Sequence, residues 1–179
     1  SSAASDVYKR QDKGDGSLTG YNVWKWIDYD NYNYPYAGAG SPDFSTNWII
    51  LRYAEIYLND AEARLETGDV EGARKAVNMI RQRVGLPDLT ESDPEKLREL
   101  IRKERRIEFA FEEQRFYDVR RWKIGPETQT TLHGVRFVSP TEFKVTKTDI
   151  RTWNDRLYLT PVPHDEIVRS SVLKQNPGY

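Results

Sequence analysis

Between residues 46 and 66 the apolar positions recur at three- and four-residue steps, the spacing of an amphipathic helix. Thr46 or Asn47 can cap its beginning, and Gly68 supplies a stop after it. The apolar face of this first predicted helix consists of Ile49, Ile50, Tyr53, Ala54, Tyr57, Leu58, Ala61 and Leu65.

A second helix with the same spacing is predicted to follow Asp69, which serves as its N-terminal cap. It ends before Gly85 and Pro87. The side chains that we expect it to bury are Val70, Ala73, Val77 and Ile80.

Small residues on both predicted helices let the two backbones approach closely, as in a tetratricopeptide-type helix pair. These residues are Ala54, Ala61, Ala73 and Ala76. One such pair cannot bury its own apolar face, so we expect neighbouring repeats and interpret the chain as part of a longer domain. Without those neighbours, large apolar side chains of the first helix should form an exposed patch. The alternative is an isolated helical hairpin that packs on a third helix.

A third helix is predicted to start at Ser92 or Asp93, with Pro94 at its first helical position, where the missing N–H costs nothing. It should run past Arg115 and end at the latest before Gly125. Its apolar stripe consists of Leu97, Leu100, Ile101, Ile107, Ala110 and Phe111.

The run ERRIEFAFEEQRFYDVRRW, which begins at Glu104, places charged residues beside that stripe. An unpaired buried ion is costly, so we predict a structural ion-pair network of Glu104, Arg105, Glu108 and Arg115. The alternative is catalysis, because Glu104 and Glu108 lie one helical turn apart, as the two carboxylates of a retaining glycosidase could. We favour ion pairing because each acid has arginines close in sequence, whereas a general acid must hold a proton.

The rest of the chain predicts little regular structure. The first residues, 1–11, have no periodicity, and we interpret them as a non-native junction. Residues 12–47 are predicted to form an aromatic-rich loop segment with a short strand near Tyr21. Residues 134–146, around Pro140, predict a short hairpin or an irregular extended stretch. The tail should wrap the helices as extended coil, with a helical turn from Pro163 to Val168.

Composition and motifs exclude several functions. A net charge of -1 with interleaved acids and bases argues against a nucleic-acid partner, and the absence of cysteine excludes disulfides and thiolate chemistry. His133 and His164 stand in loop-like sequence without further ligands, and the stretch DKGDGS fails the EF-hand spacing, so no metal site is expected. No nucleotide or nucleophile-elbow motif occurs, so we expect no cofactor and no enzyme activity.

An aromatic stretch, WKWIDYDNYNYPY, suggests a carbohydrate-binding loop, because flat rings stack on sugar faces and polar neighbours bind the hydroxyl rim. The candidate residues are Trp24, Trp26, Asp28, Tyr29, Asn31, Tyr32, Tyr34 and Tyr36, with Asp30 and Asn33 beside them. The alternative is that these rings pack in the core. Trp153 and Asn154 form a lesser candidate pair.

Three blocks of the chain resemble the SusD/RagB family, the surface glycan-binding lipoproteins that partner outer-membrane transporters. They are the charged run from Glu104 to Trp122, the stretch RYAEIYLNDAEARLETGDVEGARKAVNMIRQRVGLP from Arg52, and the tail YLTPVPHDEIVRSSVLKQNPGY from Tyr158. The resemblance implies that residues 48–179 form the family's C-terminal helical region, within one incomplete domain. The expected fold is mainly α, a tetratricopeptide-like scaffold with irregular loops, short strands and an extended C-terminal tail.

The resemblance also implies a function, which is capture of an oligosaccharide at the cell surface and its delivery to a SusC-like TonB-dependent transporter, without catalysis. Family members are held on the outer membrane by a lipidated N-terminal cysteine. This chain has no cysteine and no apolar run near the ~20 residues of a membrane span, so membrane association is expected only through an anchor that the chain lacks. The competing hypothesis is a tetratricopeptide-type scaffold that binds protein and no sugar. Hydrolysis is a third, weaker one.

Overall fold

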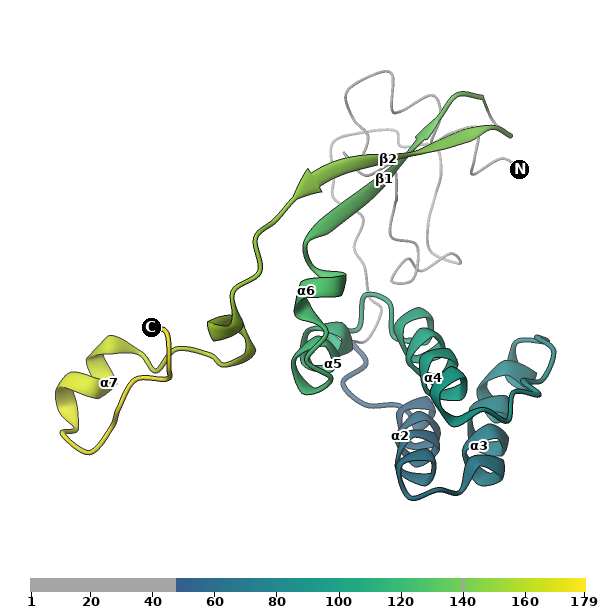
Figure 1. Ribbon diagram of the computed structural model, residues 1–179, viewed down its shortest axis with the longest axis horizontal. Coiled ribbons are helices and arrows are strands. Elements are labelled where there is room, and N and C mark those ends of the chain that lie inside the picture. The colour runs from purple at the N-terminus through teal and green to yellow at the C-terminus, as the bar shows by residue number, and fades with distance from the viewer. Residues whose placement is uncertain (1–47, 140) are drawn as a thin grey trace. The chain divides into compact units, whose positions relative to one another are not determined.

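The computed structural model describes residues 48–139 and 141–179. The chain divides into two compact units, whose described parts are residues 48–115, the helical unit, and residues 116–179 without residue 140, the hairpin unit. Helices account for most of the regular structure, so the predicted mainly α class is confirmed (Figure 1).

Two antiparallel helices, α2 (Tyr53–Glu66) and α3 (Val70–Arg83), begin the helical unit and pack side by side (Figure 1). The turn between them passes through Gly68, whose φ of +89° is a left-handed conformation that glycine adopts without strain. As predicted, the Asp69 carboxylate caps α3 by accepting the Gly72 N–H at 2.8 Å.

The third helix of this unit, α4 (Pro94–Glu108), also has its predicted start. Asp93 accepts the N–H groups of Glu95 and Lys96 at 2.9 and 3.2 Å, and Pro94 occupies the first turn. The three helices share one core, whose fully buried members include Leu58, Ala61, Ala73, Val77 and Leu97. All four small residues of the predicted pair are buried, which is what allows α2 and α3 to approach closely.

The first helix begins later than the sequence pattern predicts. Its N-cap is Arg52, whose backbone is extended with φ -145° and ψ 157°, and residues 48–52 are not helical. The predicted cap at Thr46 or Asn47 is therefore wrong. The physical reason lies in the Arg52 side chain, which is bound to Glu108 and Glu112 and holds the chain extended immediately before α2.

The predicted continuous helix through Arg115 is also wrong, because α4 ends at Glu108 and α5 (Gln114–Arg121) starts separately. Between them Phe111 and Glu113 both have φ of 63°. A left-handed non-glycine residue costs about 1–2 kcal/mol, so other contacts must stabilise the turn. The break leaves Ile107 and Phe111 exposed at 61% and 56%, although the predicted stripe included both.

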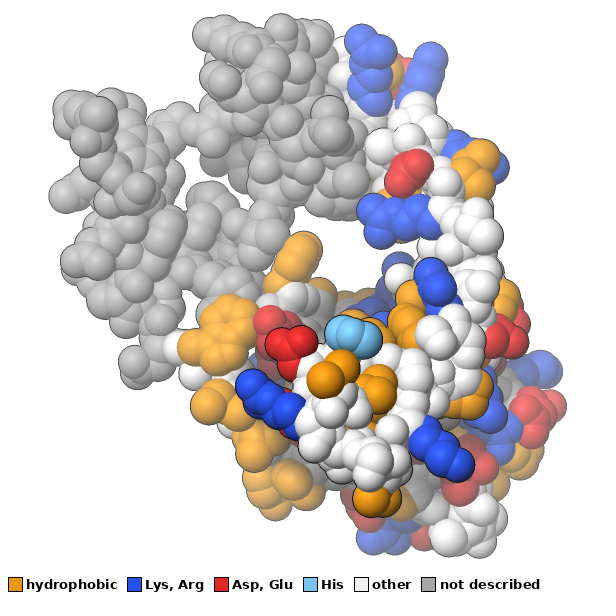
Figure 2. All heavy atoms as spheres, turned by 90° about the vertical axis from the view of Figure 1, so that its left-hand side faces the viewer, with side chains coloured by type: hydrophobic (Ala, Val, Ile, Leu, Met, Phe, Trp, Pro, Cys, Tyr) orange, Lys and Arg blue, Asp and Glu red, His pale blue; other side chains and the backbone are white. Residues whose placement is uncertain are grey.

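Several large apolar side chains stay exposed before and on α2. Ile50 and Leu51 are 79% and 75% exposed, and Trp48, Ile49, Tyr53 and Ile56 are exposed as well. Exposed apolar side chains are thus found here, as we expected for a helix pair without neighbouring repeats. In the view of Figure 2, hydrophobic side chains lie next to one another on the surface.

In the hairpin unit, α6 (Gly125–Thr128) leads into β1 (Thr131–Phe137), which pairs antiparallel with β2 (Phe143–Ile150). Val135 stands opposite Val145 and Phe137 opposite Phe143, which confirms the predicted hairpin and lengthens it. The 3-10 helix η1 (Asp155–Tyr158) and α7 (His164–Arg169) follow, so the predicted helical turn is confirmed. That the tail wraps the helices stays a prediction.

Candidate functional site

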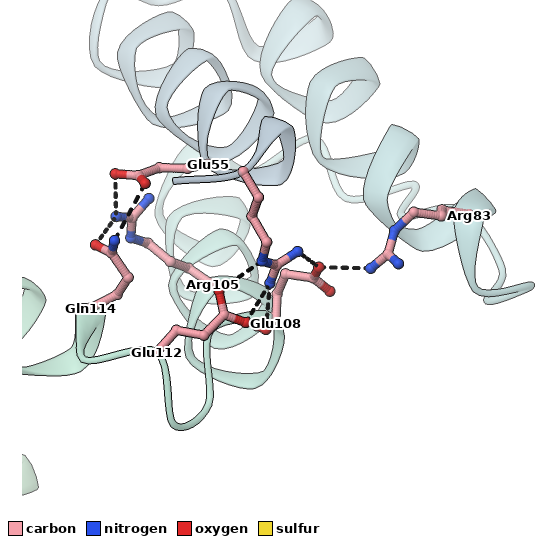
Figure 3. Close-up of polar contacts among 7 residues, drawn as sticks. Glu55, Arg83, Arg105, Glu108, Glu112 and Gln114 are labelled. Carbon is pink, nitrogen blue, oxygen red and sulfur yellow. Dashed lines mark hydrogen bonds and ion pairs between the residues drawn. The ribbon is translucent and has the colours of Figure 1, made fainter. Parts of the chain in front are cut away.

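Figure 3 shows a group of polar and charged side chains in the helical unit, among them Glu108 and Glu112, and both of these acids pair with Arg52. Its Nε donates to Glu112 Oε2 at 2.7 Å and its Nη2 to Glu112 Oε1 at 3.0 Å, a two-bond pair across sixty residues of sequence. Nη2 also donates to the Glu108 carbonyl oxygen at 2.7 Å, and Nη1 pairs with the Glu108 carboxylate. Burial opposes the charge of Arg52, but the hydrogen bonds to Glu112 and Glu108 outweigh it and raise its pKa.

An aromatic ring completes this group. The guanidinium carbon of Arg52 lies 4.6 Å from the centroid of the Phe109 ring, and that of Arg105 lies 5.1 Å from it. Phe109 is the C-cap residue of α4 and only 3% exposed. The two cations thus pack on the residue at which α4 ends, and they stabilise the turn that breaks the predicted helix.

Two of the acids of α4, Glu104 and Glu108, pair with arginines of α3. Arg81 Nη1 lies 2.7 Å from Glu104 Oε2, and Arg83 Nη2 lies 2.6 Å from Glu108 Oε1 (Figure 3 draws the second pair). Glu104 is buried, whereas Arg83 is largely exposed. Glu108 therefore has at least two guanidinium partners, one from residue 52 and one from α3.

Arg105 is buried and connects α4 to α2 and α5. Its Nη1 donates to Asn59 Oδ1 at 2.8 Å and its Nη2 to Gln114 Oε1 at 3.3 Å, while Glu55 Oε1 is 3.9 Å away. Gln114 in turn donates to Glu55 at 3.3 Å, so its amide bridges the cation and the acid (Figure 3). Arg115, the fourth residue of the predicted network, is half-buried.

This arrangement suits charge neutralisation better than proton transfer. Glu104, Glu108 and Glu112 each accept from at least one guanidinium, so each of these acids has a cationic partner. A glycosidase needs one carboxyl group that holds a proton for the leaving group. The geometry therefore gives the catalytic reading of Glu104 and Glu108 no support.

Most of this group escaped sequence reasoning. Arg52, Arg81, Arg83, Glu55, Asn59, Glu112 and Gln114 were not predicted members. The contacts of Arg52 join residues 56 and 60 positions apart, so no helical spacing reveals them. The only signal was the charged run itself, because buried acids there require cationic partners somewhere in the fold.

The predicted carbohydrate-binding residues lie outside the described part of the chain. They are Trp24, Trp26, Asp28, Tyr29, Asn31, Tyr32, Tyr34 and Tyr36, and the short strand predicted near Tyr21 lies outside it as well.

The lesser candidates, Trp153 and Asn154, are described and make packing and capping contacts. The half-buried Trp153 ring lies against Gly125, and its centroid is 5.0 Å from that of Tyr158. Asn154 Oδ1 accepts the Arg156 N–H at 3.0 Å and caps η1. One face of the Trp153 ring is thus occupied by the chain itself.

Within residues 48–139 and 141–179 no group of three or more His, Asp or Glu side chains is placed to hold a metal ion. His133 is exposed on β1, opposite Lys147, and His164 opens α7. Of the helices in these same residues, none combines the length and the apolar character that crossing a bilayer demands.

Comparison with known proteins gives consistent results. A model of the SusD family matches residues 4–179. SusD-like protein P2 of Formosa agariphila is 38% identical over 155 residues, and SusD-like protein P25 of the same organism is 32% identical over 172. These matches cover 80% and 84% of this chain but 28% and 31% of the two relatives.

A crystal structure of a SusD-like protein from Bacteroides fragilis is 98% identical in the matched region, with a TM-score of 0.83. The match covers 94% of this chain and 32% of that one. The chain therefore spans about a third of the length of the relatives that it matches.

Proposed function

Because this chain belongs to the SusD family, we propose that the whole protein binds an oligosaccharide or related nutrient at the cell surface and hands it to a SusC-like TonB-dependent transporter. Members of the family are generally glycan-binding proteins of nutrient uptake. The observation that carries the proposal is the family match across residues 4–179, together with the 98% identical SusD-like structure.

In this proposal the helical unit is a scaffold and performs no chemistry. Its buried acids have guanidinium partners, and α2, α3 and α4 share one hydrophobic core. Such a scaffold suits binding proteins, in which a fixed framework positions loops that contact the ligand.

The ligand-binding residues that we propose are the aromatic and polar residues from Trp24 to Tyr36. Their rings offer stacking surfaces for the apolar faces of sugars, and their Asp and Asn neighbours offer hydrogen-bond partners for hydroxyl groups. Aromatic residues alternate with Asp and Asn over this short stretch, and this alternation supports the loop as the ligand-binding site. The proposal concerns the loop as a whole and assigns no single contact.

For localisation we propose the outer surface of the outer membrane, with attachment through a lipid anchor. Family members are outer-membrane lipoproteins, and this chain has no cysteine that could carry the lipid.

Affinity electrophoresis in gels that contain different polysaccharides, run with the full-length protein, tests the proposal. Retardation by at least one glycan, without release of reducing sugar, is the expected result. Release of reducing sugar would replace the proposal with hydrolysis. Absence of any glycan binding, combined with capture of a partner protein by the helical unit, would favour the tetratricopeptide-type scaffold, which the exposed apolar side chains around α2 also allow.

A further inference from the structure

In the hairpin unit the last five residues, Gln175 to Tyr179, fold back onto the chain just before α7. Gln175 Oε1 accepts the Val162 N–H at 2.8 Å, and Gln175 Nε2 donates to the Val162 carbonyl oxygen at 2.9 Å. The side-chain amide thus pairs with both backbone groups of one residue, as a neighbouring β-strand would. Both residues are half-buried.

Two further side chains of these five residues bind the same short stretch. Asn176 Nδ2 donates to the Thr160 carbonyl oxygen at 2.6 Å, and the Tyr179 hydroxyl donates to the Leu159 carbonyl oxygen at 3.1 Å. The Tyr179 ring also lies 5.3 Å from the Arg156 guanidinium. Side chains of three residues therefore hold the backbone of residues 159, 160 and 162.

These contacts close the stretch from Pro163 to Lys174 into a loop with its ends together, which is the form of an Ω-loop. The loop contains α7, a helix of six residues with no buried side chain. A helix this short is not stable alone, because its few hydrogen bonds do not repay the entropy of nucleation. Its order must therefore come from the closure of the loop.

We propose that Gln175, Asn176 and Tyr179 form an intramolecular clasp that keeps α7 folded by holding the two ends of its loop together. The clasp consists of hydrogen bonds near the surface, which are individually weak. It therefore opens locally, and α7 unfolds with it while α2, α3 and α4 stay folded. Such a device controls the shape of this surface loop independently of the helical core.

Hydrogen exchange of backbone amides in the full chain tests the clasp. The reporters are the amides of Ile167 and Ser170, which donate to the carbonyl oxygens of Pro163 and Glu166, and neither acceptor is a clasp residue. Gln175→Ala should accelerate exchange at both by about tenfold, together with Val162, and leave the core amides of α2 unchanged. Gln82→Ala is the matched control, because the Gln82 amide donates to Asp88 at 2.9 and 3.0 Å in the helical unit.

Acceleration confined to Val162 would overturn the proposal, because it would reduce the contact to a single local hydrogen bond. Loss of protection throughout α2, α3 and α4 would overturn it too, because the clasp would then be part of global folding. Tyr179→Phe supplies a milder second variant that removes only the hydroxyl donor. It should accelerate the same two reporters by a smaller factor, and unchanged rates at both would contradict the proposal.

Discussion

Arg52 and Glu112 form a two-bond ion pair that joins the residue before α2 to the turn after α4. The Glu112 side chain is only 6% exposed, and Glu108, which shares the same guanidinium, is 11% exposed. Loss of the arginine would leave both carboxylates nearly buried with fewer partners, and Phe109 would lose one of its two cations.

Arg52→Ala should therefore destabilise the helical unit by about 2–3 kcal/mol. Arg52→Lys should recover only part of the loss, because an ammonium group cannot form the two parallel bonds of the guanidinium. Guanidinium chloride denaturation followed by circular dichroism measures the effect. The control is Arg64→Ala, which removes the exposed pairs with Asp60 and Asp69 and should lower stability much less, because water screens exposed pairs. Equal losses for both variants would contradict a special role for Arg52.

Glu113→Gly should stabilise the protein, by up to about 1 kcal/mol, because Glu113 has a φ of 63° that glycine adopts without strain. The same substitution at the exposed Glu99 inside α4 should destabilise by about 1 kcal/mol. Thermal unfolding of the two variants compares them directly. If Glu113→Gly destabilises the protein as much as Glu99→Gly does, α4 and α5 form one continuous helix, without a left-handed turn between them.

Gly125→Ala should destabilise the hairpin unit by about 1–3 kcal/mol, because a Cβ at that position would stand 2.1 Å from Trp153 Cε2. Combining it with Trp153→Leu removes the ring that causes the clash, so the double variant should lose less than the sum of the two single losses. Tryptophan fluorescence and thermal unfolding report the effect. Strictly additive losses would show that residue 125 and Trp153 do not touch.

The cap of α3 should respond to acid. The pKa of the Asp69 carboxyl is lowered, first by the hydrogen bond from the Gly72 N–H and then by Arg64. A carboxyl with a lowered folded-state pKa contributes stability above its unfolded value, and this contribution is lost as the pH falls through the folded value. Wild type should thus exceed Asp69→Asn in thermal stability at neutral pH. The difference should begin to shrink as the pH falls below about 4 and should disappear only below the lowered folded-state pKa. A difference that does not depend on pH would contradict this assignment.

The proposed carbohydrate loop gives a prediction for binding. In the full-length protein, Trp26→Ala should weaken binding of a glycan that retards the protein in the affinity gel. The expected loss of affinity is about two- to tenfold, which corresponds to the binding free energy of one stacked aromatic ring. The matched control is Trp48→Ala, which removes an exposed tryptophan outside the loop. Isothermal titration calorimetry measures both variants. Unchanged affinity in single alanine variants of Trp24, Trp26 and Tyr32 would place the binding site elsewhere.

Local signals in the sequence predicted the helical unit well. Asp69 and Asp93 cap their helices because a short acidic side chain reaches the first free N–H groups, and this depends only on neighbouring residues. Gly68 likewise occupies the position in the turn after α2 at which the backbone needs a positive φ. Such features can be predicted because their causes lie within one helical turn.

The errors arose where distant residues decide local conformation. Ile49 and Ile50 continue the helical spacing, but Arg52 binds acids about sixty residues away and keeps the chain extended before α2. Phe111 carries a β-carbon and gives no sign of a left-handed turn, which the burial of the nearby Phe109 stabilises. The carbohydrate site could be predicted only as a type of surface, since its residues lie outside the described structure.

The position of Arg52 matters to anyone who trims this protein to a minimal stable piece. A fragment cut where the first helix begins, at Tyr53, would keep every core residue of α2 and still discard the guanidinium that serves Glu108 and Glu112. A fragment that stops with α4, at Glu108, would discard Glu112. Boundaries that keep these partners, and Gln114 between Arg105 and Glu55, therefore enclose residues 52–114. They are set by polar contacts and differ from the ends of the helices.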